Sequence, residues 1–187
     1  MTLARLGFRF ALLLFAALVV GCGDDDNLPD PASPNIVDTL TLGSLVGTPI
    51  ATPSGFSVYN GSVRTDQSAD FDFAYNIEAG GRQVFLPRAA LGLPSSTTAD
   101  PGLQRRDDRF DEIGEAPSNG YTTEDPVPFA LGDRFVVRSR VNGCGNLGVP
   151  RYAKIEIIGI EGELVILKVL ANTNCGYKGL EPGLPDR

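Results

Sequence analysis

The chain has 187 residues, a length that fits one domain. It carries 23 acidic and 16 basic side chains, and the net charge of −7 argues against nucleic acid or an anionic membrane surface as a partner. It has no histidine, which excludes a Ser-His or Cys-His nucleophile and any zinc site that uses imidazole.

The N-terminus has the pattern of an export signal. Arg5 and Arg9 precede an unbroken apolar run over 10–20. The run is too short for an ordinary membrane span. The run ends in the string Leu-Val-Val-Gly-Cys, which is typical of a bacterial lipobox. We therefore expect residues 1–21 to be a lipoprotein signal peptide and Cys22 to carry the lipid that anchors the protein. The alternative is a plain secretory signal with a chance cysteine.

A tether is expected next, over residues 22–45. Its first part is acidic and proline-rich, a composition that does not bury enough apolar surface to fold. The aspartates that follow Cys22 lack the ligand spacing of a calcium loop. They are similar to the export signal that sends some bacterial lipoproteins to the cell surface. Scattered aliphatic residues over 36–50 fit either a first edge strand or an extended entry.

Strand patterns begin at residue 55. Asn60-Gly61 separates two short apolar runs, which is a strong signal for a hairpin. Over 71–77, aromatic and aliphatic residues alternate with Asp72 and other polar or small residues, which predicts a half-buried strand with an aromatic inner face. Two glycines then turn the chain into a further strand over 82–86.

Residues 87–128 hold most of the proline, serine, threonine and charge, with little periodicity. Long irregular segments of this kind are usually functional or disordered loops, and short helices fit around 87–92 or 107–112. An acidic cluster here permits a carboxylate pair or a metal site. The arginines beside it favour a solvated, self-neutralising stretch instead. The acids are Asp107, Asp108, Asp111 and Glu112, and the arginines are Arg105, Arg106 and Arg109.

The strongest strand signals are three apolar, β-branched runs over 134–141, 152–160 and 163–171. Glu161-Gly162 is a two-residue connection, so we expect it to close the hairpin between the last two runs.

In that register Ile158 faces Val165, and Ile157 and Ile166 lie on the core face. The last run is apolar on both faces, which predicts an inner strand over 163–171.

Two cysteines remain once Cys22 is assigned to the lipid. Cys144 and Cys175 lie just past the ends of two expected strands, at the same edge of the sheet. An even pair in an oxidising compartment favours a disulfide, which would contribute roughly 3–4 kcal/mol. A metal site would lack a histidine or further cysteine to complete it.

These patterns predict an all-β protein of antiparallel sheets, a sandwich or meander with long irregular loops and little helix. A single domain is expected over 46–175. The glycine- and proline-rich residues 176–187 are expected to form a flexible tail.

Three segments carry a family resemblance. Residues 55–77 hold an aromatic strand with a glycine turn, followed by Phe71-Asp72-Phe73-Ala74-Tyr75 in place of a Trp-Asp-hydrophobic-Ala-Phe strand. Residues 110–125 are similar to a loop that leads into a Gly-Tyr-Thr string in the same family. The strings RFVVRSR and RYAKIEII look like a closing hairpin. In this order, behind a lipobox and covering about 55–171, they resemble the HmuY-like haem-binding surface lipoproteins of bacteria.

The resemblance implies an all-β domain on the cell surface. Characterised members scavenge haem and pass it to a TonB-dependent outer-membrane receptor, and they hold the iron with His or Met. Here the only methionine is Met1, so haem is an option by resemblance alone. A Tyr phenolate or a Cys thiolate would be the remaining axial ligand. Tyr121 and Tyr177 are the loop tyrosines.

The sequence thus favours a non-enzymatic, lipid-anchored domain of the bacterial outer membrane that binds a ligand or a partner. We expect it to face the cell surface, with the periplasmic face as the other option. The alternative function is a surface adhesion or glycan-binding module, with a binding face in the loops of 87–128. A hydrolase that uses loop carboxylates is a third candidate.

Overall fold

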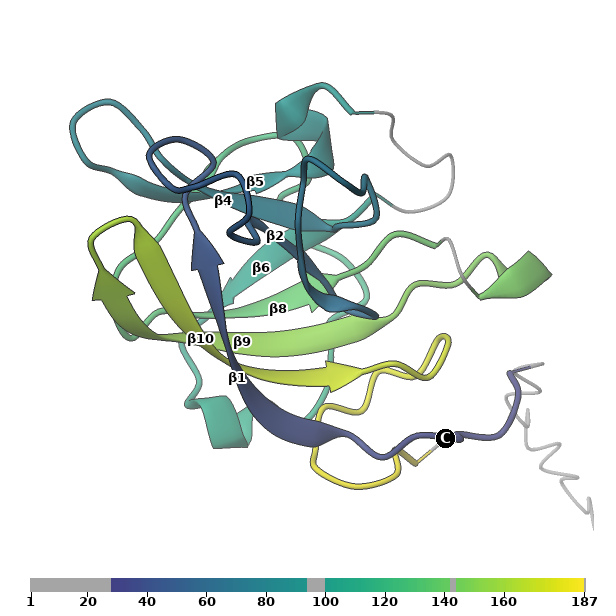
Figure 1. Ribbon diagram of the computed structural model, residues 1–187. Helices are drawn as coiled ribbons and strands as arrows, with labels where there is room; N and C mark the ends of the chain where they lie inside the picture. The colour runs from purple at the N-terminus through teal and green to yellow at the C-terminus, as the bar shows by residue number, and fades with distance from the viewer. Residues whose placement is uncertain (1–27, 94–99, 142–143, 187) are drawn as a thin grey trace, which may run out of the picture.

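The structure, a computed structural model, describes residues 28–93, 100–141 and 144–186 (Figure 1). It confirms the expected all-β class: two five-stranded antiparallel sheets enclose one core. In spatial order, the first sheet contains β1 (Ile36–Gly43), β10 (Leu164–Asn172), β9 (Tyr152–Glu161), β8 (Arg134–Arg138) and β6 (Gly102–Arg106). The second contains β3 (Gly61–Val63), β2 (Gly55–Ser57), β4 (Phe73–Ile77), β5 (Gln83–Pro87) and β7 (Val127–Pro128).

Helix is confined to three short 3₁₀ segments among the described residues. They are η1 (Arg88–Leu91), η2 (Phe110–Glu112) and η3 (Gly145–Leu147). The first two lie where short helices were expected. The part of the chain that the structure describes holds no helix that could span a membrane.

The core lies between the sheets, where aromatic rings of the second sheet meet aliphatic side chains of the first. Phe85 of β5 stacks on Phe129 with ring centroids 4.1 Å apart and meets Phe135 of β8 edge-on at 5.9 Å. Ile155 of β9 and Leu167 of β10 are fully buried in the same cluster. Burial of each such side chain stabilises the fold by about 1.5–3 kcal/mol.

The turn of the β9–β10 hairpin lies one residue later than expected. Glu161 pairs with Leu164, so Gly162 and Glu163 form the turn. Gly162 has a φ of +60°, which suits the first position of a two-residue hairpin turn. The expectation that Glu161-Gly162 forms the turn was therefore wrong.

A β-bulge then changes which face of β10 meets the core. Gly159 pairs with Ile166 and Ile157 pairs with Leu167, so the register skips Ile158. Because a shift of one residue exchanges the two faces of a strand, alternate residues of β10 from Val165 to Val169 join the core instead of Ile166. The expected placement of Ile166 in the core and of Ile158 opposite Val165 was wrong. The expectation that β10 is an inner strand is confirmed.

The first hairpin and the aromatic strand are both present, but the hairpin turn lies earlier than expected. Ser57 pairs with Gly61, so the turn contains the three residues 58–60, and Gly61, with a φ of +71°, begins β3 instead of closing the turn with Asn60. Asp72, which precedes β4 and was expected opposite the aromatic inner face, is buried with 3% of its surface exposed.

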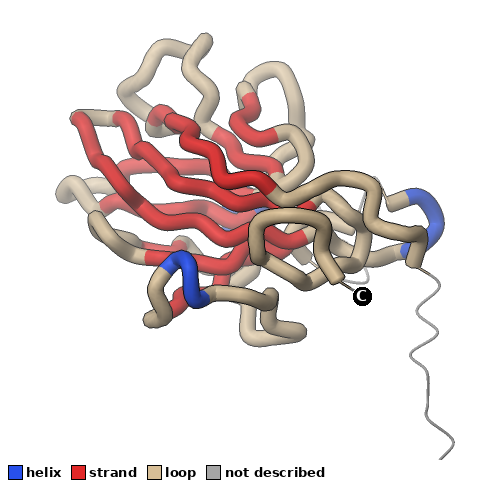
Figure 2. Tube along the Cα trace, turned by 90° about the horizontal axis from the view of Figure 1, so that it is seen from below, coloured by secondary structure: helices blue, strands red, loops and turns tan. Residues whose placement is uncertain are grey.

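The domain extends further at both ends than expected. β1 pairs with β10 along its whole length, so residues 36–43 form the edge strand and not a tether. After β10, the described part of the tail folds back on the domain (Figure 2). Tyr177 and Leu180 of this segment are buried. The long loop segment also contributes β6, which pairs with β8.

Candidate functional site

The predicted disulfide is present in the structure. Cys144 and Cys175 are bonded, with Cα atoms 5.6 Å apart, just past β8 and β10. Cys22, the predicted lipid attachment site, lies outside the described residues. The expected signal peptide lies outside them as well.

The two loop tyrosines lie in different places, and each hydroxyl already donates a hydrogen bond. Tyr121 donates to the carbonyl oxygen of Pro117 at 2.8 Å, and burial raises the pKa of its phenol. Tyr177 donates to the carbonyl oxygen of Pro29 at 3.0 Å and is 3% exposed. Neither arrangement presents a phenolate to an iron atom.

Two carboxylates of the acidic cluster in the long loop form ion pairs. Asp108 forms an ion pair with Arg106 at 2.6 Å, which lowers the pKa of that carboxyl, and Asp111 forms one with Lys168 at 3.4 Å. Within the described residues no three or more His, Cys, Asp or Glu side chains come together as a metal site. The expected self-neutralisation is confirmed for Asp108 with Arg106, whereas Asp111 pairs with Lys168 of β10 and Arg105 pairs with Asp133.

Three buried asparagines fasten the N-terminal entry of the chain to its C-terminal segment, and we call them the asparagine clasp. They are Asn35, Asn172 and Asn174. The side-chain oxygen of Asn174 accepts hydrogen bonds from the amides of Ala32 and Ser33, and its nitrogen donates to the Ser33 carbonyl oxygen.

The other two members of the clasp hold the returning tail. Asn172 donates to the carbonyl oxygens of Tyr177 and Gly179, at 3.2 and 2.8 Å. Asn35 donates to Gly179 and Glu181 at 3.1 and 3.0 Å. The clasp therefore fixes both ends of the domain side by side.

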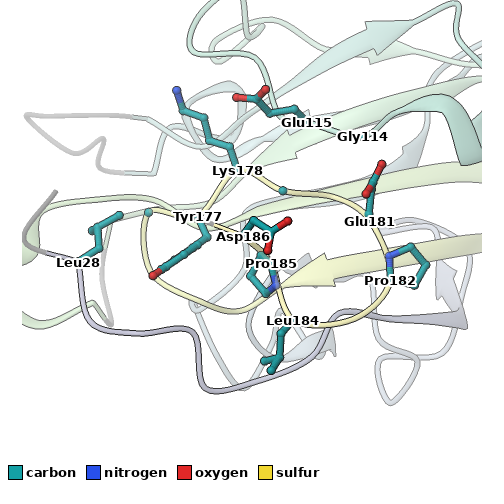
Figure 3. A pocket seen from close by; sticks show the side chains of 12 residues that line it. Leu28, Gly114, Glu115, Tyr177, Lys178, Glu181, Pro182, Leu184, Pro185 and Asp186 are labelled. Carbon is teal, nitrogen blue, oxygen red and sulfur yellow. The ribbon is translucent and has the colours of Figure 1, made fainter. Parts of the chain in front are cut away.

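A groove of about 1040 Å³ lies over this junction, and we call it the tail groove (Figure 3). It is formed by the entry segment at Leu28, the loop at Gly114 and Glu115, and residues 176–186. Its charged side chains have both signs: Glu115, Lys178, Glu181 and Asp186. Tyr177 is the one predicted ligand-binding residue that lines it.

A second concave site, of about 260 Å³, is smaller, and we call it the sheet-end crevice. The β2–β3 turn, the approach to β4, the chain just after β8 and the residue before β9 form its walls. It is lined by Ser57, Tyr59, Asn60, Asp70, Asp72, Ser139, Arg140 and Arg151.

Asp72 is the structural centre of the crevice. Its carboxylate accepts hydrogen bonds from the backbone amides of Val58 at 2.8 Å and Arg140 at 2.9 Å. The Arg140 guanidinium lies 3.8 Å away. Burial raises the pKa of Asp72 to about 6, although the two amides and the positive charge of Arg140 oppose that rise.

Sequence reasoning missed both the clasp and the crevice. The asparagines resemble ordinary turn residues, because their partners are more than 140 positions away in two of the three cases. Asp72 belongs to the segment Phe71–Tyr75 that carries the family resemblance, but the alternation of residues along that strand predicted that its side chain faces away from the core.

Comparisons of the chain with protein-family models, with curated proteins and with solved structures found no match.

Proposed function

We propose that the protein is a non-enzymatic, lipid-anchored binding domain of the bacterial outer membrane, similar in kind to the HmuY-like lipoproteins. The asparagine clasp is the observation that carries this proposal. It holds the chain at Ala32 and Ser33, shortly after the lipidation signal. Fully extended, the stretch from Cys22 to Leu28 spans at most about 20 Å. A lipid on Cys22 would therefore keep the clasp close to the membrane.

The tail groove lies at this anchored end of the domain, since Leu28 is one of its lining residues. Its rim carries carboxylates and an ammonium group, and Lys178 donates a hydrogen bond to Ser118 at 2.8 Å. Mixed charge of this kind complements a protein surface better than it complements a flat apolar macrocycle. We infer that the groove docks a membrane protein, with a TonB-dependent receptor as the class that the family resemblance suggests.

The residues present do not fit the family's haem site. The chain after the signal peptide has neither histidine nor methionine, and the hydroxyls of Tyr121 and Tyr177 bond to backbone carbonyls. We therefore expect haemin titration, followed in the Soret region, to show weak or absent binding. Tight capture with a low-spin, six-coordinate spectrum in the isolated monomer would contradict this expectation.

Site-specific photo-crosslinking in the producing bacterium tests the docking proposal. A photoreactive residue at Leu184, which lines the groove and is 61% exposed, should cross-link to an integral outer-membrane protein. The matched control is Leu131, which is 65% exposed and lies outside the groove lining. Equal labelling from both positions, or none from Leu184, would reject the groove as the docking place.

Glycan binding is the second candidate function. The observation that favours it is the polar sheet-end crevice and not the loops of 87–128, where the described residues include β6, β7 and short 3₁₀ helices.

A further inference from the structure

The sheet-end crevice has a rigid polar frame. The hydroxyl of Ser139 accepts a hydrogen bond from the Arg151 amide at 2.9 Å and donates one to the Arg140 carbonyl at 2.7 Å. The Ser57 hydroxyl accepts from the Asn60 amide at 3.2 Å. Together with the two amides on Asp72, these bonds fix the walls before any ligand arrives. A pre-organised site loses less entropy on binding.

The charges of the crevice are balanced. The Arg140 guanidinium contacts Asp70 at 2.8 Å and Asp72 at 3.8 Å. Two carboxylates thus accompany the arginines and disfavour a free anion as the ligand. Donors and acceptors lie side by side, which suits neighbouring hydroxyl groups, because each hydroxyl donates one hydrogen bond and accepts others. The Nε of Arg140 is buried and faces the Asp72 carboxylate at 3.8 Å, which holds the guanidinium against the floor of the crevice.

An aromatic ring stands at the rim. Tyr59 is 62% exposed, although tyrosine is usually more buried than this. The Arg151 guanidinium lies over the ring, 4.4 Å from its centroid, and the Arg151 Nε donates to the Thr173 carbonyl oxygen at 2.6 Å. One face of the ring is therefore covered by a fixed cation, and with 62% of the residue still exposed the ring remains accessible to a flat partner.

Size narrows the class of ligand. The volume of about 260 Å³ is below the range of roughly 300–1,000 Å³ that holds drug-sized molecules. One six-membered sugar ring combines that size with a hydrophobic C–H face and vicinal hydroxyls. We propose that the sheet-end crevice binds a single pyranose residue of a neutral saccharide. Tyr59 stacks on the ring, and Asn60, Asp70 and Arg140 bond its hydroxyl groups.

This proposal depends on the second candidate function, glycan binding, and it concerns a site separate from the tail groove.

Amide-resolved NMR titration of the folded domain tests it. The neutral ligands are methyl mannoside, methyl galactoside and N-acetylglucosamine, and glucuronate and sulfate serve as anionic probes. At least one neutral sugar should shift the amide signals of Tyr59, Asn60 and Arg140, with saturation in the millimolar range. No shift from any of the neutral sugars, or a response to the anionic probes alone, would overturn the proposal.

Variants locate the contact. Tyr59→Ala should weaken sugar binding by about tenfold or more, because it removes the aromatic face on which the sugar ring stacks. Tyr59→Phe keeps the ring and should retain most of the affinity. Leu131→Ala is the control, an exposed residue outside the crevice, and should change nothing. Photo-crosslinking from Leu184 should be unaffected by Tyr59→Ala, so failure at one site is distinguishable from failure at the other.

Discussion

Asp72 connects the two sheets through a single carboxylate. The Val58 amide that it accepts from belongs to the β2–β3 turn of the second sheet, and the Arg140 amide lies just past β8 of the first. Removal of a buried, hydrogen-bonded carboxylate usually costs several kcal/mol, because the amides that it satisfied are left without acceptors. Asp72→Ala is therefore expected to loosen the joint between the sheets as well as the crevice.

The pH dependence of stability reports this residue. Burial raises the folded-state pKa of Asp72 to about 6 from the ordinary value of 3.8, against the influence of Arg140, Arg88 and the amides. Between those values the folded state holds a proton that the unfolded state has released, so this group's contribution to stability falls as pH rises. Above pH 6 the contribution should be constant.

Urea denaturation from pH 4 to pH 8 measures this effect against Asp72→Asn, which does not titrate. The free energy of unfolding of the wild type, minus that of the variant, should fall between about pH 4 and pH 6 and then level off. A difference that rises over this interval would show that the hydrogen bonds outweigh burial and that the carboxylate is charged throughout.

Residue placement was only partly predictable from the sequence. The disulfide pair followed from cysteine count and from strand ends, which are local features. The burial of Asp72 could not be predicted in this way. Alternation along a strand indicates which face of the strand a residue occupies, but it does not indicate which other segments cover that face. The same holds for Tyr177, whose partner at Pro29 is 148 positions away.

At the scale of elements, the strands of the second half were predicted well and their register was not. Apolar, β-branched runs signal a strand through local composition. A glycine in a tight turn fits either position of that turn, so Gly162 did not fix the pairing. The bulge at Ile158 shifts the pairing by one residue, and the apolar pattern of the strand does not predict it. The glycine at position 159 is related to this local geometry, since a Cβ there would come within 3.0 Å of Ile166.

Neighbouring substitutions in β10 test the observed register. Leu167→Ala should lower the free energy of unfolding by about 2–5 kcal/mol, because the side chain is fully buried between the sheets. Ile166→Ala should cost clearly less, since Ile166 is half-buried on the opposite face. Denaturant midpoints of the two variants decide the matter. Equal costs, or a larger cost for Ile166→Ala, would favour the register without the bulge.

The disulfide joins the chain after β8 to the chain after β10. By the chain-entropy argument, a bond across a separation of 31 residues contributes roughly 3–4 kcal/mol. The double variant Cys144→Ser, Cys175→Ser should therefore melt roughly 10 °C lower, as measured by calorimetry. Mass mapping of the protein without reduction should recover the cross-linked peptides. Two free thiols would contradict the pairing.

For the whole molecule, the fold class could be predicted from the sequence, because residue alternation and turn signals are local features. The tail groove could not be predicted. The tail groove exists because Asn35, Asn172 and Asn174 bring distant segments together, and composition alone indicated a flexible tail over 176–187. If Cys22 carries a lipid, as proposed, the clasp would set which end of the sandwich lies nearest the membrane.

The anchor itself is tested by Cys22→Ser. A thiol is required for lipid attachment, so the variant should leave the membrane pellet and appear in the soluble fraction, while the wild type stays with the outer membrane in high salt. Acyl chains contribute about 0.8 kcal/mol per buried CH₂ group, so their loss removes far more membrane affinity than a surface of net negative charge replaces. The double variant of Cys144 and Cys175 is the control and should still pellet, because neither sulfur lies in the lipidation signal. Cys22→Ser protein that remains in the outer-membrane pellet at high salt would show that another part of the chain holds the domain there.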